Sequence, residues 1–249
     1  MKNKIVASLL VLSMLFVGIM LTGCSKSAAE VIEPAFNNTK ALKSYSATMV
    51  ISVKSDNDFN KVDDSTTSQI ELNGKKMYVK TGVTGNDKMT ELYTDGEWVY
   101  SYASKMGNKK KVSDDNKLTY AEELKKLFIA PTAESLAEIE MVENEDGSQS
   151  ATIAIDKETL NKNYNEYVSG ISVFKASNLP IDLYDGKLEI TVNEAGYVTA
   201  YKVTCKTDRT WIGNQLVHDI TFDITFDNPG ADITVTDLPA KDVKFIEIK

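Results

Sequence analysis

The sequence predicts an α+β protein built on a strongly curved antiparallel sheet, a half-barrel of about ten strands, with two or three helices on its concave side. Short segments of alternating apolar and polar residues recur along the chain, and several are joined by Asn-Gly or Asp-Gly turns. Segments with helical spacing interrupt these hairpins rather than alternating with the strands one for one, which is typical of α+β proteins. An antiparallel sheet of this size has to curl.

The chain begins with an export signal. Lys2 and Lys4 precede an uncharged run of 17 residues that ends in small side chains. The next four residues, Leu21-Thr22-Gly23-Cys24, resemble the lipobox of bacterial lipoproteins. The resemblance implies removal of residues 1–23, lipid attachment to the thiol of Cys24, and a protein held by this lipid on the extracytoplasmic face of the cell membrane. An uncleaved membrane helix and a secretory signal with an incidental cysteine are the alternatives.

Length and composition limit which kinds of protein the 226 residues left after removal of residues 1–23 can form. Their length suits a single domain, expected at 34–249 after a lipidated tether at 24–33. The whole chain has a net charge of −8, and the loss of Lys2 and Lys4 makes it −10, so nucleic acid is not an expected partner. Once Cys24 carries lipid, Cys205 has no disulfide partner, and its position in a strand pattern favours a buried thiol.

Three helices are expected. The first follows Pro34, the second begins with a capping box at Thr119–Glu122, and the third opens at Asp156 with an apolar stripe from Leu160 to Phe174. The alternating segments that predict strands lie at 45–53, 66–72, 75–82, 88–94, 97–103, 138–145, 148–155, 188–192, 197–207 and 215–226, and a further apolar strand is expected at the C-terminus. Within 215–226, His218 shares a face with Leu216, Ile220 and Phe222.

The order of these features resembles a known family. A lipobox, a tether, a helix ending in ALKSYSA, a strand, and hairpins such as GKKMYVKT and ELYTDGEWVYSY are similar to extracytoplasmic lipoproteins with the fold of the lipoprotein carrier LolA and the mycobacterial lipoprotein LppX. In that family, helices close a curved half-barrel over a hydrophobic cavity for acyl chains. The resemblance rests on element order, so no family site residue is carried over to this chain.

Catalytic and metal-binding motifs are not evident in the sequence. His218 is the single histidine, and no G-x-S-x-G turn accompanies it. The acidic residues do not follow the spacing of a calcium loop, and no His/Cys cluster suits zinc. We therefore expect a protein that is not an enzyme and has no cofactor.

The leading hypothesis is a binding protein for a lipid or another hydrophobic ligand. The alternative is an interaction or scaffold domain of the cell envelope with a filled core and no ligand. The oligomeric state is left open. The aromatic face of Trp98, Tyr100 and Tyr102 is compatible with cross-strand packing, a pocket wall or an exposed patch. The residues expected to line a ligand cavity are Met49, Ile51, Val53, Trp98, Tyr100, His218 and Phe222.

Overall fold

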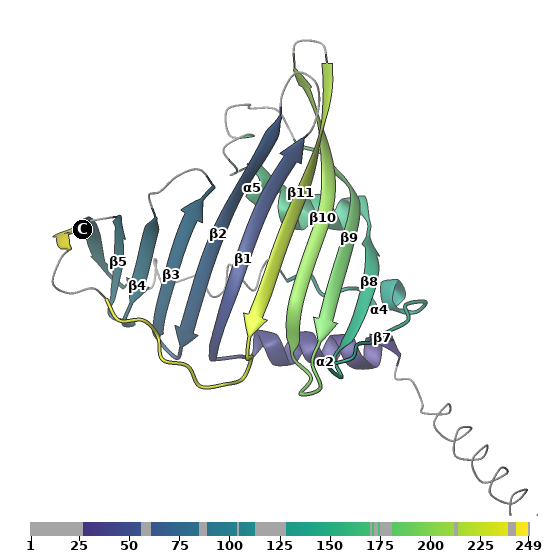
Figure 1. Cartoon of the computed structure of the whole chain (residues 1–249), viewed down its shortest axis with the longest axis horizontal. Helices are drawn as coiled ribbons and strands as arrows, with labels where there is room; N and C mark the ends of the chain where they lie inside the picture. The colour runs from purple at the N-terminus through teal and green to yellow at the C-terminus, as the bar shows by residue number, and fades with distance from the viewer. Residues whose placement is uncertain are drawn as a thin grey trace, which may run out of the picture.

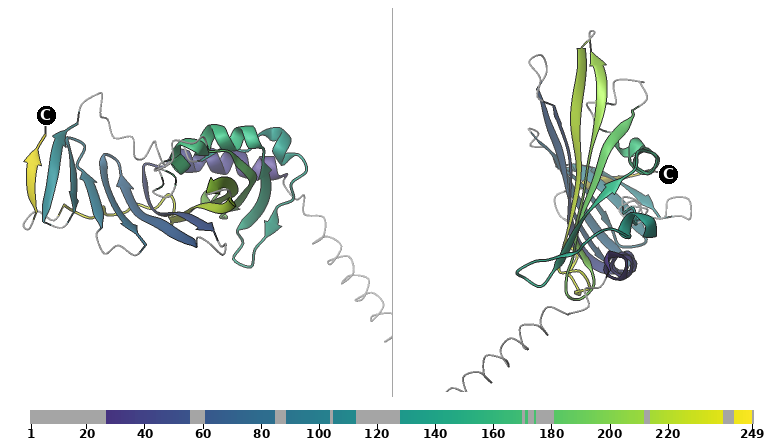
Figure 2. Two further views of the ribbon diagram at one scale, coloured as in Figure 1. Left: turned by 90° about the horizontal axis from the view of Figure 1, so that it is seen from above. Right: turned by 90° about the vertical axis from the view of Figure 1, so that its right-hand side faces the viewer.

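A computed structural model describes residues 27–55, 61–84, 89–103, 105–112, 128–169, 171, 174, 181–211, 214–238 and 243–248. This part of the chain forms one open, curved sheet with three helices on the same face, as Figures 1 and 2 show. The helices are α2 (Ala28–Lys40), α4 (Ala133–Leu136) and α5 (Lys157–Ser169). The strands are β1 (Ser44–Ser55), β2 (Val62–Asn73), β3 (Lys76–Val83), β4 (Thr90–Thr94), β5 (Trp98–Ala103), β6 (Met106–Lys111), β7 (Val142–Glu143), β8 (Gln149–Ile155), β9 (Leu183–Val192), β10 (Val198–Trp211), β11 (Asn214–Asp227) and β12 (Lys244–Glu247).

The strands lie in the order β12-β6-β5-β4-β3-β2-β1-β11-β10-β9-β8-β7. Most neighbours in space are neighbours in sequence, as expected of a meander, and the pairing of β1 with β11 joins two such runs. The Asn-Gly and Asp-Gly turns expected from the sequence, at Asn73-Gly74, Asp95-Gly96 and Asp146-Gly147, are confirmed. Gly74 and Gly96, for example, have φ of 61° and 93°, values that glycine adopts without steric cost.

The α+β class and the curved sheet are confirmed, with two corrections to the expected half-barrel. The described residues contain twelve strands rather than about ten, and the sheet is mixed because β12 pairs with β6 in parallel. Strand β6, which carries the basic run Lys109–Lys111, is therefore not the edge of the sheet. The predicted helix at Thr119–Glu122 lies outside the described residues, as does Cys24.

Helix α2 begins six residues before the expected position at Pro34. Ser27 caps it: the Ser27 hydroxyl accepts a hydrogen bond from the Glu30 amide at 3.3 Å, and the Ser27 amide donates to the Glu30 carboxylate at 2.8 Å. The pattern Ser27-x-x-Glu30 is a capping box, which could have been recognised in the sequence. Pro34 lies inside the helix, where it removes one backbone hydrogen bond.

The main core lies between the three helices and strands β1 and β8 to β11. Its buried side chains run from Ala28 to Phe226 in the sequence, and a smaller cluster on the other face extends to Val235. A chain that begins at Ser25 therefore contains all of the described core. Figure 2 shows that the helices cover only this part of the sheet, and that none of the described helices lies over β3 to β6.

Candidate ligand-binding face

Cross-strand register divides the side chains of the sheet between two faces, because residues directly opposite each other in neighbouring strands point the same way. Met49 pairs with Ile224, Ile51 with Phe222, and Val53 with Ile220. These residues face the helices, and we call this side the inner face. The opposite side is the outer face.

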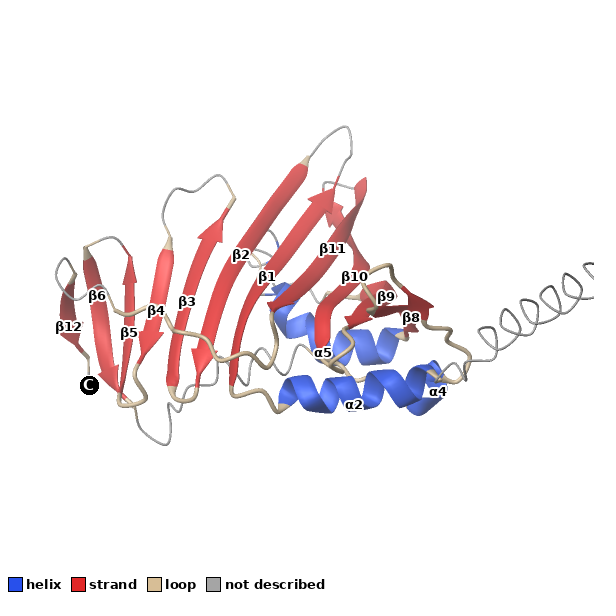
Figure 3. Ribbon diagram, turned by 60° about the horizontal axis from the view of Figure 1, so that its bottom comes forward, coloured by secondary structure: helices blue, strands red, loops and turns tan. Residues whose placement is uncertain are grey.

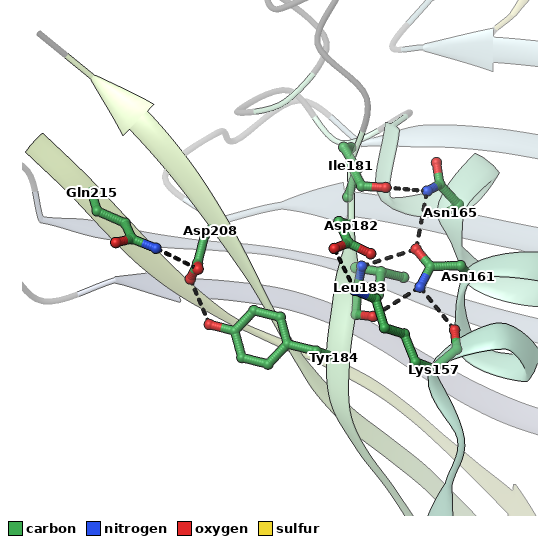
Figure 4. A network of polar contacts seen from close by, with 9 residues as sticks. All are labelled: Lys157, Asn161, Asn165, Ile181, Asp182, Leu183, Tyr184, Asp208 and Gln215. Atoms are coloured by element: carbon green, nitrogen blue, oxygen red, sulfur yellow. Dashed lines mark hydrogen bonds and ion pairs between the residues drawn. The ribbon is translucent and has the colours of Figure 1, made fainter. Parts of the chain in front are cut away.

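A polar network holds α5 against the inner face at β9 (Figure 4). The Asn161 side chain accepts a hydrogen bond from the Leu183 amide at 2.9 Å and donates to the Leu183 carbonyl at 2.8 Å. Asn165 donates to the Ile181 carbonyl, and Lys157 forms an ion pair with Asp182 at 2.6 Å. Two asparagines thus satisfy backbone groups at the start of β9 and fix the helix above the strand.

Aromatic side chains fill the space beneath the helices. Tyr164 of α5 packs on Phe222 of β11 with ring centroids 4.8 Å apart, and both side chains are fully buried. Tyr201 lies between Phe36 of α2 and Phe128, at centroid distances of 5.9 Å and 4.8 Å. The hydroxyls of Tyr164 and Tyr201 are 2.8 Å apart, and the Tyr201 hydroxyl accepts a hydrogen bond from the Ile129 amide at 3.0 Å.

The seven residues predicted to line a cavity separate into two groups. Five of them lie on the inner face of β1 and β11: Met49, Ile51, Val53, His218 and Phe222. Of these, Val53, His218 and Phe222 are about 1% exposed, whereas Met49 and Ile51 are half-buried.

Trp98 and Tyr100 lie instead on the outer face. Tyr100 pairs with Tyr93, which pairs with Tyr78, and this row continues to Glu71 and Ser46 on the reverse of β1. The seven residues therefore do not line one cavity, because the sheet itself separates the two groups.

The outer-face aromatics are covered by the C-terminal segment, which the sequence did not reveal. Val235 is buried against Tyr78 and Tyr93, and the Thr236 amide donates a hydrogen bond to Glu71 at 2.6 Å. Further along, Phe245 of β12 packs edge-on against Tyr100 and Tyr102, with centroids 5.1 Å and 5.7 Å away. Residues 228–238 thus cross the outer face from β11, and residues 243–248 contain β12 at the far edge of the sheet, as Figures 1 and 3 show. We call them the C-terminal strap.

Of the three readings of Trp98, Tyr100 and Tyr102, cross-strand packing agrees best with these contacts. Trp98 carries the Lys109 ammonium 4.6 Å above its ring, and Lys109 pairs with Glu247 of the strap at 3.4 Å. The Tyr78 and Tyr102 hydroxyls both donate to one Glu91 oxygen, and burial together with these bonds raises the pKa of both phenols.

Beyond the helices the inner face carries apolar side chains interspersed with polar ones, since Ser68, Thr66 and Asp64 of β2 lie opposite Met49, Ile51 and Val53. Five side chains on β1, β2 and β4 pack against the edge of the main core but are only half-buried: Met49, Ile51, Val62, Leu72 and Leu92. Further from the helices the same face becomes polar, with Ser101 and Asn108 paired and exposed. A partly exposed apolar band therefore lies where the helix cover ends.

Two hollows bordered by described residues do not include any of the predicted cavity residues. One, of about 40 Å³, lies between residues 129–132, β8 and the start of α5, and has room for water but not for an acyl chain. The other is an open depression of about 400 Å³ at the sheet edge, bordered by residues 138–142 and 150–152. The cavity role of the seven residues stays a prediction.

The buried titratable groups of this face are held neutral. Burial raises the pKa of the Cys205 thiol to about 12, which agrees with the inert thiol expected from its strand position. Burial also lowers the pKa of His218 below its usual 6.5. The Asp208 and Asp219 carboxylates, which act in the opposite direction on this pKa, belong to the outer face, and Asp208 there binds Tyr184 and Gln215 (Figure 4).

Within the described residues, His/Cys/Asp/Glu side chains do not gather into a metal-binding group. The hydroxyls beside His218 belong to Ser55 and Thr207, which are themselves buried. His218 therefore does not form a Ser-His-Asp arrangement with an accessible nucleophile in this part of the structure. None of the described helices has the length and hydropathy needed to span a membrane.

Comparisons with known proteins match this chain to solved structures, among them the following two. One is the crystal structure of the LolA superfamily protein NE2245 from Nitrosomonas europaea, which is 11% identical, with 88% of this chain and 98% of that chain covered and a TM-score of 0.26. The other is the ywiB protein from Bacillus subtilis, 10% identical, covering 75% of this chain and 94% of that chain, with a TM-score of 0.19. No protein-family model matches the sequence, and no curated protein matches it either. At these TM-scores the likeness carries no argument about the site.

Proposed function

We propose that this chain is an extracytoplasmic lipoprotein, anchored in the cell membrane through lipid on Cys24, whose inner face binds a lipid or another hydrophobic ligand without chemical conversion. The observation that supports binding is the half-buried apolar band beside the helix cover, with Met49 and Ile51 at its centre. Each methylene group that leaves water for such a surface contributes about 0.8 kcal/mol. The lipobox sequence supports the anchor.

Native mass spectrometry of a chain beginning at Ser25 tests the ligand. We expect a hydrophobic molecule of defined mass to co-purify with the protein and to be lost from an Ile51→Gln variant. The matched control is Val50→Gln, because Val50 is also half-buried but lies on the outer face of the same strand. A protein that is always empty, or a ligand lost equally from both variants, would favour the filled-core interaction domain.

Replacement of Cys24 tests the anchor. The unaltered chain should incorporate radiolabelled palmitate and fractionate with membranes, and Cys24→Ala should abolish the label and leave the signal uncut. A Cys24→Ala protein that was still processed and membrane-bound would refute lipid anchoring. The distant Cys205→Ala variant is the control, since its buried thiol should not take part.

A further inference from the structure

A row of buried polar side chains crosses the inner face near the C-terminal end of β1. Thr207 of β10 pairs directly with His218 of β11, and the register of β1 places Ser55 opposite His218 on the other side. The three side chains are 2%, 1% and 3% exposed. The adjoining rows are Val53, Ile220 and Cys205, then Ile51, Phe222 and Val203.

His218 is incompletely satisfied in this row. Its Nδ1 atom is buried and has no hydrogen-bond partner among the described residues, while the ring of Phe174 packs edge-on against the imidazole at 5.3 Å. A buried polar atom left without a partner destabilises the folded protein. Such an atom marks a place where a further polar group can bind.

Two side chains of opposite charge, Arg209 and Asp64, lie near the row on the inner face. Arg209 lies on the same face of β10, one row beyond Thr207, and is half-buried. Its guanidinium is close enough to help lower the pKa of His218. Asp208 and Asp219 also influence His218 but belong to the outer face, and Asp64 faces the inner side opposite Val53.

We propose that Ser55, Thr207, His218 and Arg209 form a subsite for the anionic oxygen head group of an acyl-chain ligand. The acyl chain would lie along the apolar rows toward Ile51 and Met49, and the head group would receive hydrogen bonds from the hydroxyls and the imidazole beside the guanidinium charge. This inference rests on the proposed function and adds the class of ligand, an amphiphile with a carboxylate or phosphate head.

The test compares ligands of equal chain length and different head group. Dodecanoate, dodecyl phosphate and dodecanol are titrated against the chain beginning at Ser25, loaded with the neutral fluorescent probe N-phenyl-1-naphthylamine. We expect at least one anion to displace the probe at a roughly tenfold lower concentration than the alcohol, the gain typical of a charge-assisted hydrogen bond. The better of the two anions identifies the head group.

Two variants test whether the proposed subsite causes the preference for the anions over the alcohol. Thr207→Val and Arg209→Gln should each weaken binding of the anion more than binding of dodecanol, so that the ratio of anion to alcohol affinity falls several-fold. Thr204→Val is the control, because Thr204 lies on the same strand but on the outer face. If all three ligands displace the probe equally, the row holds internal water only and the inference is wrong. If none displaces it, the proposed function fails as well.

Discussion

Tyr201 joins three parts of the core through its hydroxyl, and its replacement by phenylalanine should be unusually destabilising for the loss of one oxygen atom. The side chain is fully buried, accepts the Ile129 amide at 3.0 Å and contacts the Tyr164 hydroxyl at 2.8 Å. Tyr201→Phe removes both hydrogen bonds and leaves the Ile129 amide without this acceptor. A net hydrogen bond contributes about 1 kcal/mol and an unsatisfied group costs about 1–3 kcal/mol, so we expect a loss of about 2–4 kcal/mol.

Tyr164→Phe should cost less, about 1 kcal/mol, because the bond between Tyr201 and Ile129 survives. The double variant should be little worse than Tyr201→Phe alone, since either substitution removes the same Tyr–Tyr bond. The assay is urea unfolding of the chain from Ser25, followed by circular dichroism. Tyr100→Phe is the control, as no hydrogen bond of its hydroxyl is seen among the described residues. The reasoning would be refuted if Tyr201→Phe lay within 0.5 kcal/mol of the unaltered protein, on the order of a surface substitution.

Three further outcomes are expected. Asn161→Ala should lower the unfolding free energy by about 2–3 kcal/mol, because it leaves the Leu183 backbone groups unsatisfied; a urea midpoint equal to that of the unaltered protein would contradict the helix attachment. Burial raises the pKa of Tyr45 and Tyr201 to about 12 in the folded chain, whereas both ionise near 10 when unfolded. Stability should therefore be intact below pH 10 and fall as the pH rises towards 12, and an unchanged urea midpoint at pH 11 would argue against this burial. Phe245→Ala removes two edge-on aromatic contacts and should cost about 1–3 kcal/mol, with amide exchange accelerated first in β5 and β6; uniform acceleration across β10 and β11 would show that the strap is not a local element.

Much of the architecture was predictable because local patterns carry it. Alternation along 215–226 correctly placed His218 among buried apolar residues, since successive side chains of a strand point to opposite faces. Asn73-Gly74 and Asp95-Gly96 located two hairpins, because a turn with positive φ requires residues of this kind. The apolar stripe at Leu160 and Tyr164 likewise identified the buried side of α5.

The division of the candidate site between two faces could not be predicted in this way. Alternation sorts the residues of one strand into two sets, but it does not say which set faces the helices. That choice depends on register between strands. Tight turns fix the register of β2 with β3 and of β4 with β5, whereas longer connections join β1 to β2 and β3 to β4. Trp98 and Met49 are separated by both longer connections and lie on opposite faces.

Contacts between distant segments also could not be predicted from the sequence. The C-terminal strap has no strong period, and its hold on the outer face comes from single contacts such as Thr236 with Glu71 and Phe245 with Tyr100. The sequence alone determined most of the strands, most of the turns and the cysteine at which lipid is expected. The tertiary structure decided which strands became neighbours and which side the helices cover. It also brought Ser55 into one row with Thr207 and His218. The pairing of β1 with β11 does this, and it joins residues more than 150 positions apart in the chain, which local sequence patterns do not reveal.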